Sequence, residues 1–190
     1  MVLNRLPLRV SLAHRGVHLD LAECPICNSG LEDKDHIFAY CPFASMVWTQ
    51  VGVWLKLPIV SSSSLDNIMD TTGYGMRNGS SLQIIVDSVL KSALWCIWKT
   101  RNDRVFKNIN PCPYKTVEEI KILSFLWVKN RAKFGWLEWN MWVGSNLLLL
   151  PPVIPPPPFL RPPAVSAAAS NCTSSPLLRS PATCLIFRFF

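Results

Sequence analysis

The sequence has little that would place it in or across a membrane. A spanning helix needs about 20 consecutive apolar residues, and the run Leu147–Leu150 is followed at once by Pro151 and Pro152. The N-terminus lacks the apolar stretch of roughly 7–15 residues and the small-residue cleavage site of a secretory signal. We therefore expect no membrane partner and an intracellular protein of the nucleus or cytoplasm that is not secreted.

Acidic residues are also sparse, with twelve Asp and Glu among 190 residues. Enzymes that transfer phosphoryl groups with two metal ions hold those ions in a carboxylate cluster. The sequence contains no paired-aspartate motif of this kind, and its acidic residues are too scattered to nominate a ribonuclease H site. We therefore expect the chain not to be an enzyme.

The net charge of +7 is distributed unevenly. Residues 1–50 hold four Lys or Arg and five Asp or Glu, residues 51–145 hold twelve and seven, and residues 146–190 hold three and none. A basic surface favours phosphate backbones or acidic partners. The excess positive charge therefore lies in the helical part and the tail, and not in the first 50 residues.

Cysteine and histidine come together in one short stretch. Cys24 and Cys27 are followed by His36 and Cys41, in the pattern Cys-x2-Cys-x8-His-x4-Cys. Zinc takes four tetrahedral ligands from Cys sulfur and His nitrogen, and the close spacing of the first pair lets one turn present both sulfurs to one ion. Asn28-Ser29-Gly30 can reverse the chain so that the two ligand pairs face each other. The pattern predicts bound Zn²⁺.

Four protein ligands would leave no position for a catalytic water, so the predicted zinc is structural. Three alternatives remain for these residues. Cys24 and Cys27 could be a redox pair, although such a motif normally opens a long helix in a βαβ unit. The cysteines could form disulfides, which would suit a secreted chain, or the spacing could arise by chance.

The ligands lie within a longer pattern. It begins with Leu-Pro-Leu-Arg-Val-Ser-Leu-Ala-His-Arg-Gly at residues 6–16 and continues through Glu32, His36-Ile37-Phe38, Cys41-Pro42-Phe43-Ala44 and Val47-Trp48. This pattern resembles the zinc-binding domain that follows the polymerase in reverse transcriptases of plant-type LINE (non-LTR) retrotransposons. A second block, Trp95–Phe106, resembles the helical segment that comes after it in those elements. The resemblance spans roughly residues 5–142 and implies descent from a retroelement.

Apolar periodicity predicts a mainly α fold. Residues 5–16 predict a short helix ended by Gly16, and Pro42 suits the first turn of a second helix. An apolar stripe follows at helical spacing, made of Phe43, Met46, Val47, Val51, Trp54 and Leu55. We expect residues 1–57 to form a small helical module that the zinc ion staples together.

The rest of the chain divides by composition. Residues 58–80 are rich in Ser, Gly and Asn and predict a linker. Residues 81–142 predict two antiparallel helices that are separated by Pro111 and Pro113, with Thr116 and Glu119 as a capping box for the second. Residues 143–190 predict a disordered tail, because ten of the sixteen prolines lie at 146–190 without any acidic residue.

The expected function is association with nucleic acid, single-stranded RNA or DNA, in a reverse-transcriptase context. The candidate phosphate contacts are Arg9, Arg15, Lys99, Arg101, Arg104 and Lys107. Basic residues on a solvated helix face are common without any ligand, and this alternative stays open. Two other functions are a zinc-stabilised scaffold that binds a reverse transcriptase or another protein, and an inactive retrotransposon remnant.

Overall fold

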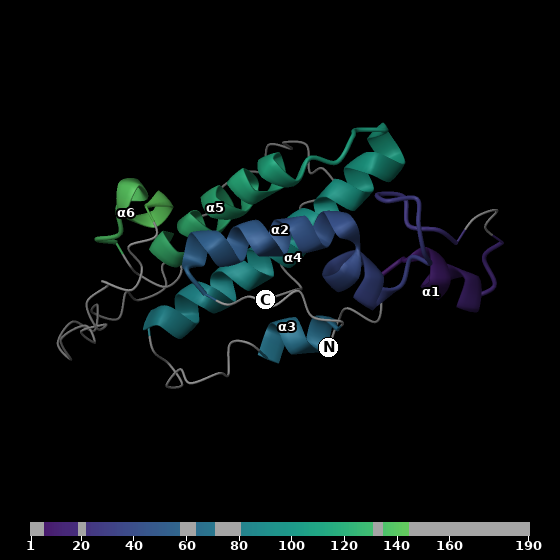
Figure 1. Ribbon diagram of the computed structural model, residues 1–190, viewed down its shortest axis with the longest axis horizontal. Helices are drawn as coiled ribbons and strands as arrows, with labels where there is room; N and C mark the ends of the chain where they lie inside the picture. The colour runs from purple at the N-terminus through teal and green to yellow at the C-terminus, as the bar shows by residue number, and fades with distance from the viewer. Residues whose placement is uncertain (1–5, 19–21, 58–63, 71–80, 131–134, 145–190) are drawn as a thin grey trace, which may run out of the picture. The chain divides into compact units, whose positions relative to one another are not determined.

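The computed structural model describes residues 6–18, 22–57, 64–70, 81–130 and 135–144, and they are mainly helical. The elements are α1 (Arg9–His14), the π-helix η2 (His36–Tyr40), α2 (Pro42–Leu55), α3 (Leu65–Asp70), α4 (Ser81–Lys107), α5 (Pro113–Asn130) and α6 (Trp139–Val143) (Figure 1). Within these ranges, extended pairing is limited to an isolated antiparallel bridge between Glu23 and Leu31. The mainly α fold is confirmed.

The helices α4 and α5 form the antiparallel pair that the sequence predicts. They lie side by side and are joined by residues 108–112 (Figure 1). Apolar residues at helical spacing fill the interface, and the Thr100 and Thr116 hydroxyls meet at 3.1 Å. The buried residues of these two helices include Ile85, Val89, Ala93 and Ile97 from α4 and Val117 and Ile120 from α5.

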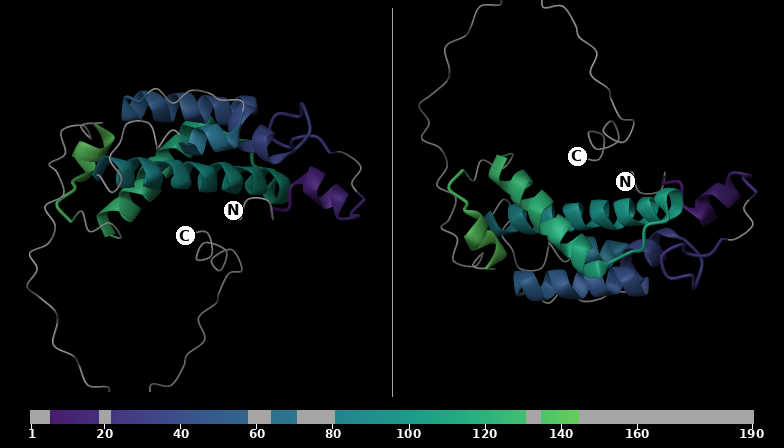
Figure 2. Two further views of the ribbon diagram at one scale, coloured as in Figure 1. Left: turned by 90° about the horizontal axis from the view of Figure 1, so that it is seen from below. Right: turned by 90° about the horizontal axis from the view of Figure 1, so that it is seen from above.

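The helix α2 packs on this pair, against α5 (Figure 2). The predicted stripe is buried except for Met46, which is 50% exposed. The indole N–H of Trp54 donates to the Trp142 carbonyl at 3.1 Å, and the two rings meet edge to face. The described residues thus share one compact unit, and the expected division between residues 1–57 and 81–142 does not separate two cores.

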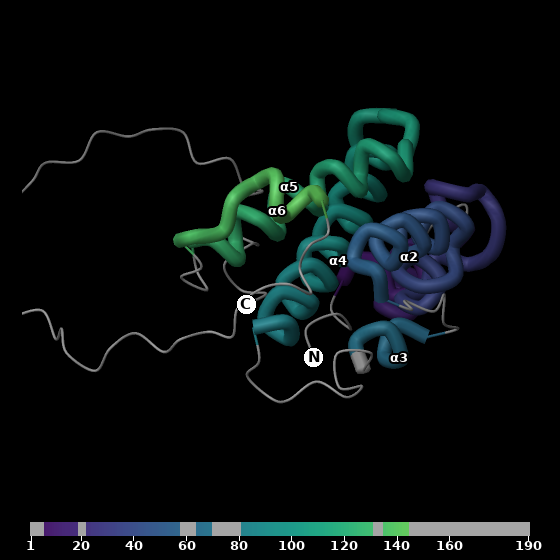
Figure 3. Tube along the Cα trace, turned by 60° about the vertical axis from the view of Figure 1, so that its left-hand side comes forward, coloured from purple at the N-terminus to yellow at the C-terminus, as the bar shows by residue number. Residues whose placement is uncertain are grey.

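The helix α6 is fixed to α5 by Trp142. This side chain is fully buried, and its indole N–H donates to the Lys121 carbonyl at 2.9 Å. Figure 3 shows α6 crossing beside α5. Residues 145–190, which include nearly all of the predicted tail, lie outside the described residues.

The predicted linker contains a helix. Leu65 and Ile68 of α3 are buried, and the α3 segment contacts η2. The Leu65 N–H donates to the Asp35 carboxylate at 3.0 Å. The linker prediction is therefore wrong for residues 65–70, because an apolar pair three residues apart gives this turn a buried face that the surrounding Ser-rich and Gly-rich composition concealed. Residues 58–63 and 71–80 lie outside the described part.

The predicted capping box is also wrong. The helix α5 begins at Pro113, four residues before Val117, the first helical residue that a cap at Thr116 predicts. Thr116 is buried inside the helix, where its hydroxyl donates to the Cys112 carbonyl at 3.1 Å. Proline at the first helical position needs no N–H partner and has a helical φ already fixed, so it starts the helix before the Thr116 signal.

By length and composition, α4 could cross a membrane, although its sequence contains no run of about 20 consecutive apolar residues. A helix that fills a protein core passes the same test. In the most hydrophobic window of α4, 44% of the residues are buried in the structure, and its apolar residues pack against α5. This packing explains the hydropathy of α4.

A buried ion pair connects the first 50 residues to α4. The Glu32 carboxylate, which is fully buried, accepts hydrogen bonds from Arg101 Nε at 2.6 Å and Nη2 at 2.8 Å. It also accepts the Arg9 backbone N–H at 2.9 Å, where α1 begins. The guanidinium lies 5.0 Å from the centre of the Trp98 ring. Three separate parts of the chain therefore meet at one carboxylate.

We predict that Arg101→Ala destabilises the protein by about 3–5 kcal/mol, because the Glu32 carboxylate would stay buried without its charged partner. The measurement is the free energy of unfolding in urea. Lys99→Ala is the matched control, since the Lys99–Glu119 pair is 44% and 48% exposed and an exposed pair contributes about 0–1 kcal/mol. Equal losses in the two variants would contradict the prediction.

Candidate metal centre

The first two ligands lie on a tight turn. The Glu23–Leu31 bridge closes this turn, and the Cys24 N–H donates to the Gly30 carbonyl at 2.9 Å. Asn28 and Gly30 have φ values of 53° and 76°, a left-handed conformation that Asn and Gly adopt more readily than other residues. The chain reversal predicted at residues 28–30 therefore takes place.

The other two ligands lie on either side of η2. His36 is its first residue, and Cys41 follows its last residue and directly precedes α2. An α-helix turns about 100° per residue, so ligands five positions apart would point about 140° from each other. In η2 the backbone is wider, and the Cys41 N–H donates to the His36 carbonyl at 2.7 Å. The π-helical turn brings His36 and Cys41 to the same side, a use of π-helices that is frequent at functional sites.

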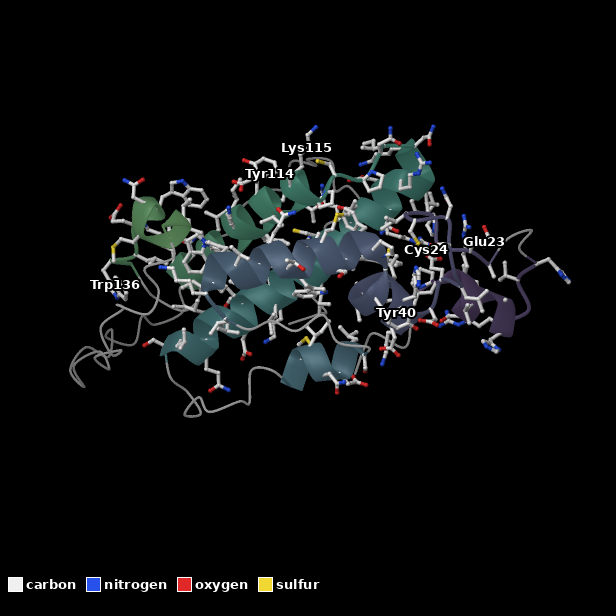
Figure 4. The ribbon with its side chains drawn as sticks, viewed as in Figure 1. Glu23, Cys24, Tyr40, Tyr114, Lys115 and Trp136 are labelled. Atoms are coloured by element: carbon white, nitrogen blue, oxygen red, sulfur yellow. The ribbon has the colours of Figure 1, made fainter. Side chains whose placement is uncertain are left out.

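The four predicted ligands converge. One ligand atom from each of Cys24, Cys27, His36 and Cys41 lies within 4.8 Å of all the others. The Cys24 and Cys41 sulfurs are 4.0 Å apart, and the Cys27 sulfur is 3.2 Å from His36 Nε2. Figure 4 labels Cys24 near the start of α2. The structure brings together every residue of the predicted ligand set.

These distances fit a tetrahedral ion. With metal–sulfur bonds of about 2.3 Å, two sulfurs on one tetrahedron lie about 3.8 Å apart, and a sulfur and a nitrogen lie slightly closer. The 4.0 Å between the Cys24 and Cys41 sulfurs is slightly longer than the sulfur–sulfur value. The 3.2 Å between the Cys27 sulfur and His36 Nε2 is slightly shorter than the sulfur–nitrogen value. Three thiols and an imidazole form a donor set that suits a soft or borderline metal ion.

The Cys24 and Cys41 sulfurs are hydrogen-bonded to each other at 4.0 Å. The hydrogen bond with the Cys41 thiol lowers the pKa of Cys24 to about 5, against the effect of burial, and backbone N–H groups of Cys27 and Ile26 add to the lowering. The same hydrogen bond is the main cause of the raised pKa of Cys41. The two thiols titrate as a pair, and one of them is readily the thiolate that metals bind.

Groups around the ligands hold them in place. The Ser29 hydroxyl donates to the Cys27 sulfur at 3.3 Å, and the Asp33 carboxylate accepts the His36 backbone N–H at 2.7 Å. A side chain on Gly30 would come within 3.3 Å of the His36 ring. The ligand spacing did not single out Ser29 or Asp33 in these roles. Both residues lie between Cys27 and His36 in the sequence, and this position could have indicated that they contact the ligands.

The remaining predicted residues lie elsewhere. Arg15 is exposed, and the Arg9 guanidinium donates to the Glu23 carbonyl at 2.7 Å. Lys99, Arg104 and Lys107 lie on α4, away from the ligands in sequence. The structure thus does not gather the six basic candidates around the metal centre.

Arg101 is a correction to the predicted phosphate contacts. Its side chain is 5% exposed, and Glu32 binds it through two nitrogens. A guanidinium in this position cannot reach a phosphate without breaking the pair. The sequence did not reveal its burial because the Glu32 partner lies 69 residues away.

We predict that Cys24→Ser removes about one metal ion per chain, because a tetrahedral site loses one of its four ligands. The metal content of purified protein, measured by plasma mass spectrometry, checks this. Cys112→Ser is the matched control, since Cys112 is a half-buried cysteine outside the cluster, and it should keep the metal. Circular dichroism should also show helix loss in Cys24→Ser, since metal binding contributes folding free energy. Unchanged metal content would count against the site.

We predict that the Cys96 thiol is unreactive towards alkylating reagents in the folded protein. Burial raises the pKa of Cys96 to about 12, with the Glu119 carboxylate adding to this and Lys99 opposing it. At pH 8 the Cys96 thiol is therefore protonated, and only the thiolate is an effective nucleophile. Iodoacetamide labelling read by peptide mass spectrometry should leave Cys96 unmodified in the folded protein and modify it in urea. Rapid labelling of Cys96 in folded protein would contradict its burial.

The ligand-bearing part of the chain is similar to a known protein family. Residues 1–48 match the family model described as zinc-binding in reverse transcriptase. The match includes all four ligands and ends at Trp48, within α2, so it does not reach the second predicted block at Trp95–Phe106. No curated protein and no solved structure matches the chain. The four converging ligands thus lie within a segment, about a quarter of the chain, that is similar to the zinc-binding domain in reverse transcriptase.

Proposed function

We propose that this protein is a non-enzymatic zinc module, derived from a plant-type LINE retroelement, that associates with single-stranded nucleic acid. The observation that carries this proposal is the closed set of three cysteines and one histidine in a domain of the reverse-transcriptase family. A reverse transcriptase works on RNA and DNA strands, so a domain of such an enzyme is placed close to single strands.

In this proposal the metal is zinc, and its role is structural. Cys24, Cys27, His36 and Cys41 would hold the ion, and structural zinc sites are closed by four protein ligands of this kind. An ion bound there would join the turn at residues 24–30 to η2 and the start of α2. The proposed contribution of zinc is therefore to the folding of this region and not to a reaction.

The distribution of charge supports a nucleic acid as the partner and favours the α4–α5 pair as the place where it binds. Residues 51–145 carry five more basic than acidic residues, whereas residues 1–50 carry one more acidic residue. Near the ligands, desolvation raises the pKa of Tyr40, and the charges of Asp33 and Asp35 add to this effect. Because carboxylates repel phosphate, we assign the phosphate contacts to the α4–α5 pair.

A protein-binding scaffold is the second candidate. Three apolar side chains on the outer faces of α2 and α5 are exposed, with values of 75% for Val53, 50% for Ile122 and 47% for Leu126. Exposed apolar side chains of this kind suit a protein interface better than a phosphate backbone. A protein partner that stays bound to the chain after nuclease treatment would favour this candidate over the first.

We predict that the full chain binds a single-stranded RNA oligonucleotide with a clear dependence on salt. Each phosphate that a basic residue neutralises adds about −0.7 to the slope of log K against log salt for a single strand. The measurement is fluorescence anisotropy of a labelled 12-nucleotide RNA, at several salt concentrations. Binding that is indifferent to salt, or no binding at micromolar protein, would overturn the proposed function.

A further inference from the structure

We propose that the turn joining α4 to α5 binds the single strand, with Phe106 and Tyr114 stacking on bases and basic residues binding phosphates. This hairpin tip is defined as residues 104–115 and includes the last turn of α4, the connecting loop and the first turn of α5. The inference rests on the proposed function and gives it a location. Its basic residues are Arg104, Lys107 and Lys115.

The two aromatic side chains of the hairpin tip stand in solvent. Phe106 is 76% exposed, the highest value among the large hydrophobic side chains of the described residues, and Tyr114 is 67% exposed. Neither ring therefore serves the core. Figure 4 shows Tyr114 and its neighbour Lys115 pointing outwards at the start of α5. Exposed aromatic rings are the platforms on which single-stranded bases stack, since every base has a π-face.

The charge of the hairpin tip suits a phosphate backbone. Between Arg104 and Lys115 the sequence has three basic residues and no acidic one. Lys107 is paired with Asp103 at 2.6 Å, and Asp103 also lies 3.3 Å from Lys99. Lys99 also binds Glu119 at 3.0 Å, so Asp103 and Glu119 balance Lys99 and Lys107. The net positive charge of the hairpin tip therefore comes from Arg104 and Lys115.

Arg104 is the basic side chain that the hairpin tip positions most firmly. Its Nη1 donates to the side-chain oxygens of Asn108 at 2.9 Å and Asn110 at 3.0 Å. Both acceptors are neutral amides, so they orient the guanidinium without cancelling its charge. A guanidinium fixed in this way can present its other N–H groups to a phosphate with little loss of entropy.

The backbone of the hairpin tip is also fixed. Asn108 ends α4 in the left-handed conformation, with a φ of 53°, and the Ile109 N–H returns to the Asp103 carbonyl at 3.2 Å. Pro113 then starts α5. A binding surface that is ordered before the ligand arrives loses less conformational freedom on binding.

Single strands are the ligand class that this arrangement favours. In a duplex the base faces are stacked on each other, so only an unpaired strand can offer them to Phe106 and Tyr114. A duplex could still use the three basic residues, since phosphate contacts do not need the base faces. The preference for single strands over duplexes of the same sequence therefore reports the aromatic part of the site.

The test uses the full chain with its metal and a labelled 12-nucleotide oligo(U) RNA. The variant Phe106→Ala with Tyr114→Ala should bind at least about ten-fold more weakly, because stacking on an aromatic ring contributes roughly a factor of 5 to 150 per base. Its salt slope should not change. The variant Arg104→Gln with Lys107→Gln and Lys115→Gln should instead lower the magnitude of the salt slope by about 2.

Two control variants separate binding from folding. Phe106→Tyr with Tyr114→Phe keeps both rings and should bind as the unchanged protein does. Val53→Ala with Lys56→Gln removes an exposed apolar group and a charge from the end of α2 and should also leave RNA binding unchanged. Thermal melting by circular dichroism should give the same midpoint for the alanine pair as for the unchanged protein, since both rings are exposed.

Two results would overturn the inference while the proposed function stands. The first is salt-dependent RNA binding that the alanine pair and the glutamine triple variant both retain in full, which would place the site elsewhere on the protein. The second is equal or tighter binding of a duplex of the same length by the unchanged protein. Absence of any RNA binding by the unchanged protein would overturn both the inference and the proposed function.

Discussion

The buried carboxylate of Glu32 is the point on which the described fold depends. It follows the turn that carries Cys24 and Cys27, it accepts the backbone N–H that starts α1, and it binds Arg101 in the middle of the chain. A charge in a protein interior is costly unless it is paired and fully hydrogen-bonded. Glu32 therefore needs all of these elements in position at once, which makes their folding cooperative.

This arrangement gives the metal centre an influence beyond its own loops. The ligand turn ends at the Glu23–Leu31 bridge, directly before Glu32. An ion that fixes the turn also fixes the position of the carboxylate, and through it the side chain of Arg101 on α4. The metal-binding region and the α4–α5 pair are consequently parts of one folding unit, in agreement with the packing of α2 against α5.

Residues of the same type have different roles in this structure. Arg101 and Arg104 lie one helical turn apart and look alike in the sequence, yet one neutralises a buried carboxylate and the other is held at the surface by two neutral amides. Trp54 and Trp142 fill the core and donate their indole N–H groups to backbone carbonyls, whereas Phe106 stays in solvent. Composition alone ranks all of these residues as equal candidates for contact with nucleic acid.

The sequence by itself determined the four ligands, the helical periods of α2, α4 and α5, and the similarity of residues 1–48 to the zinc-binding domain in reverse transcriptase. These are local features, because ligand spacing, apolar period and turn residues act over a few positions along the chain. Only the tertiary structure decided that the two helical regions share one core, that α3 lies within the predicted linker, and that Arg101 is unavailable to phosphate. Each of these depends on a partner from another part of the chain, such as the carboxylate that lies 69 residues from Arg101, and no local pattern records such a pairing.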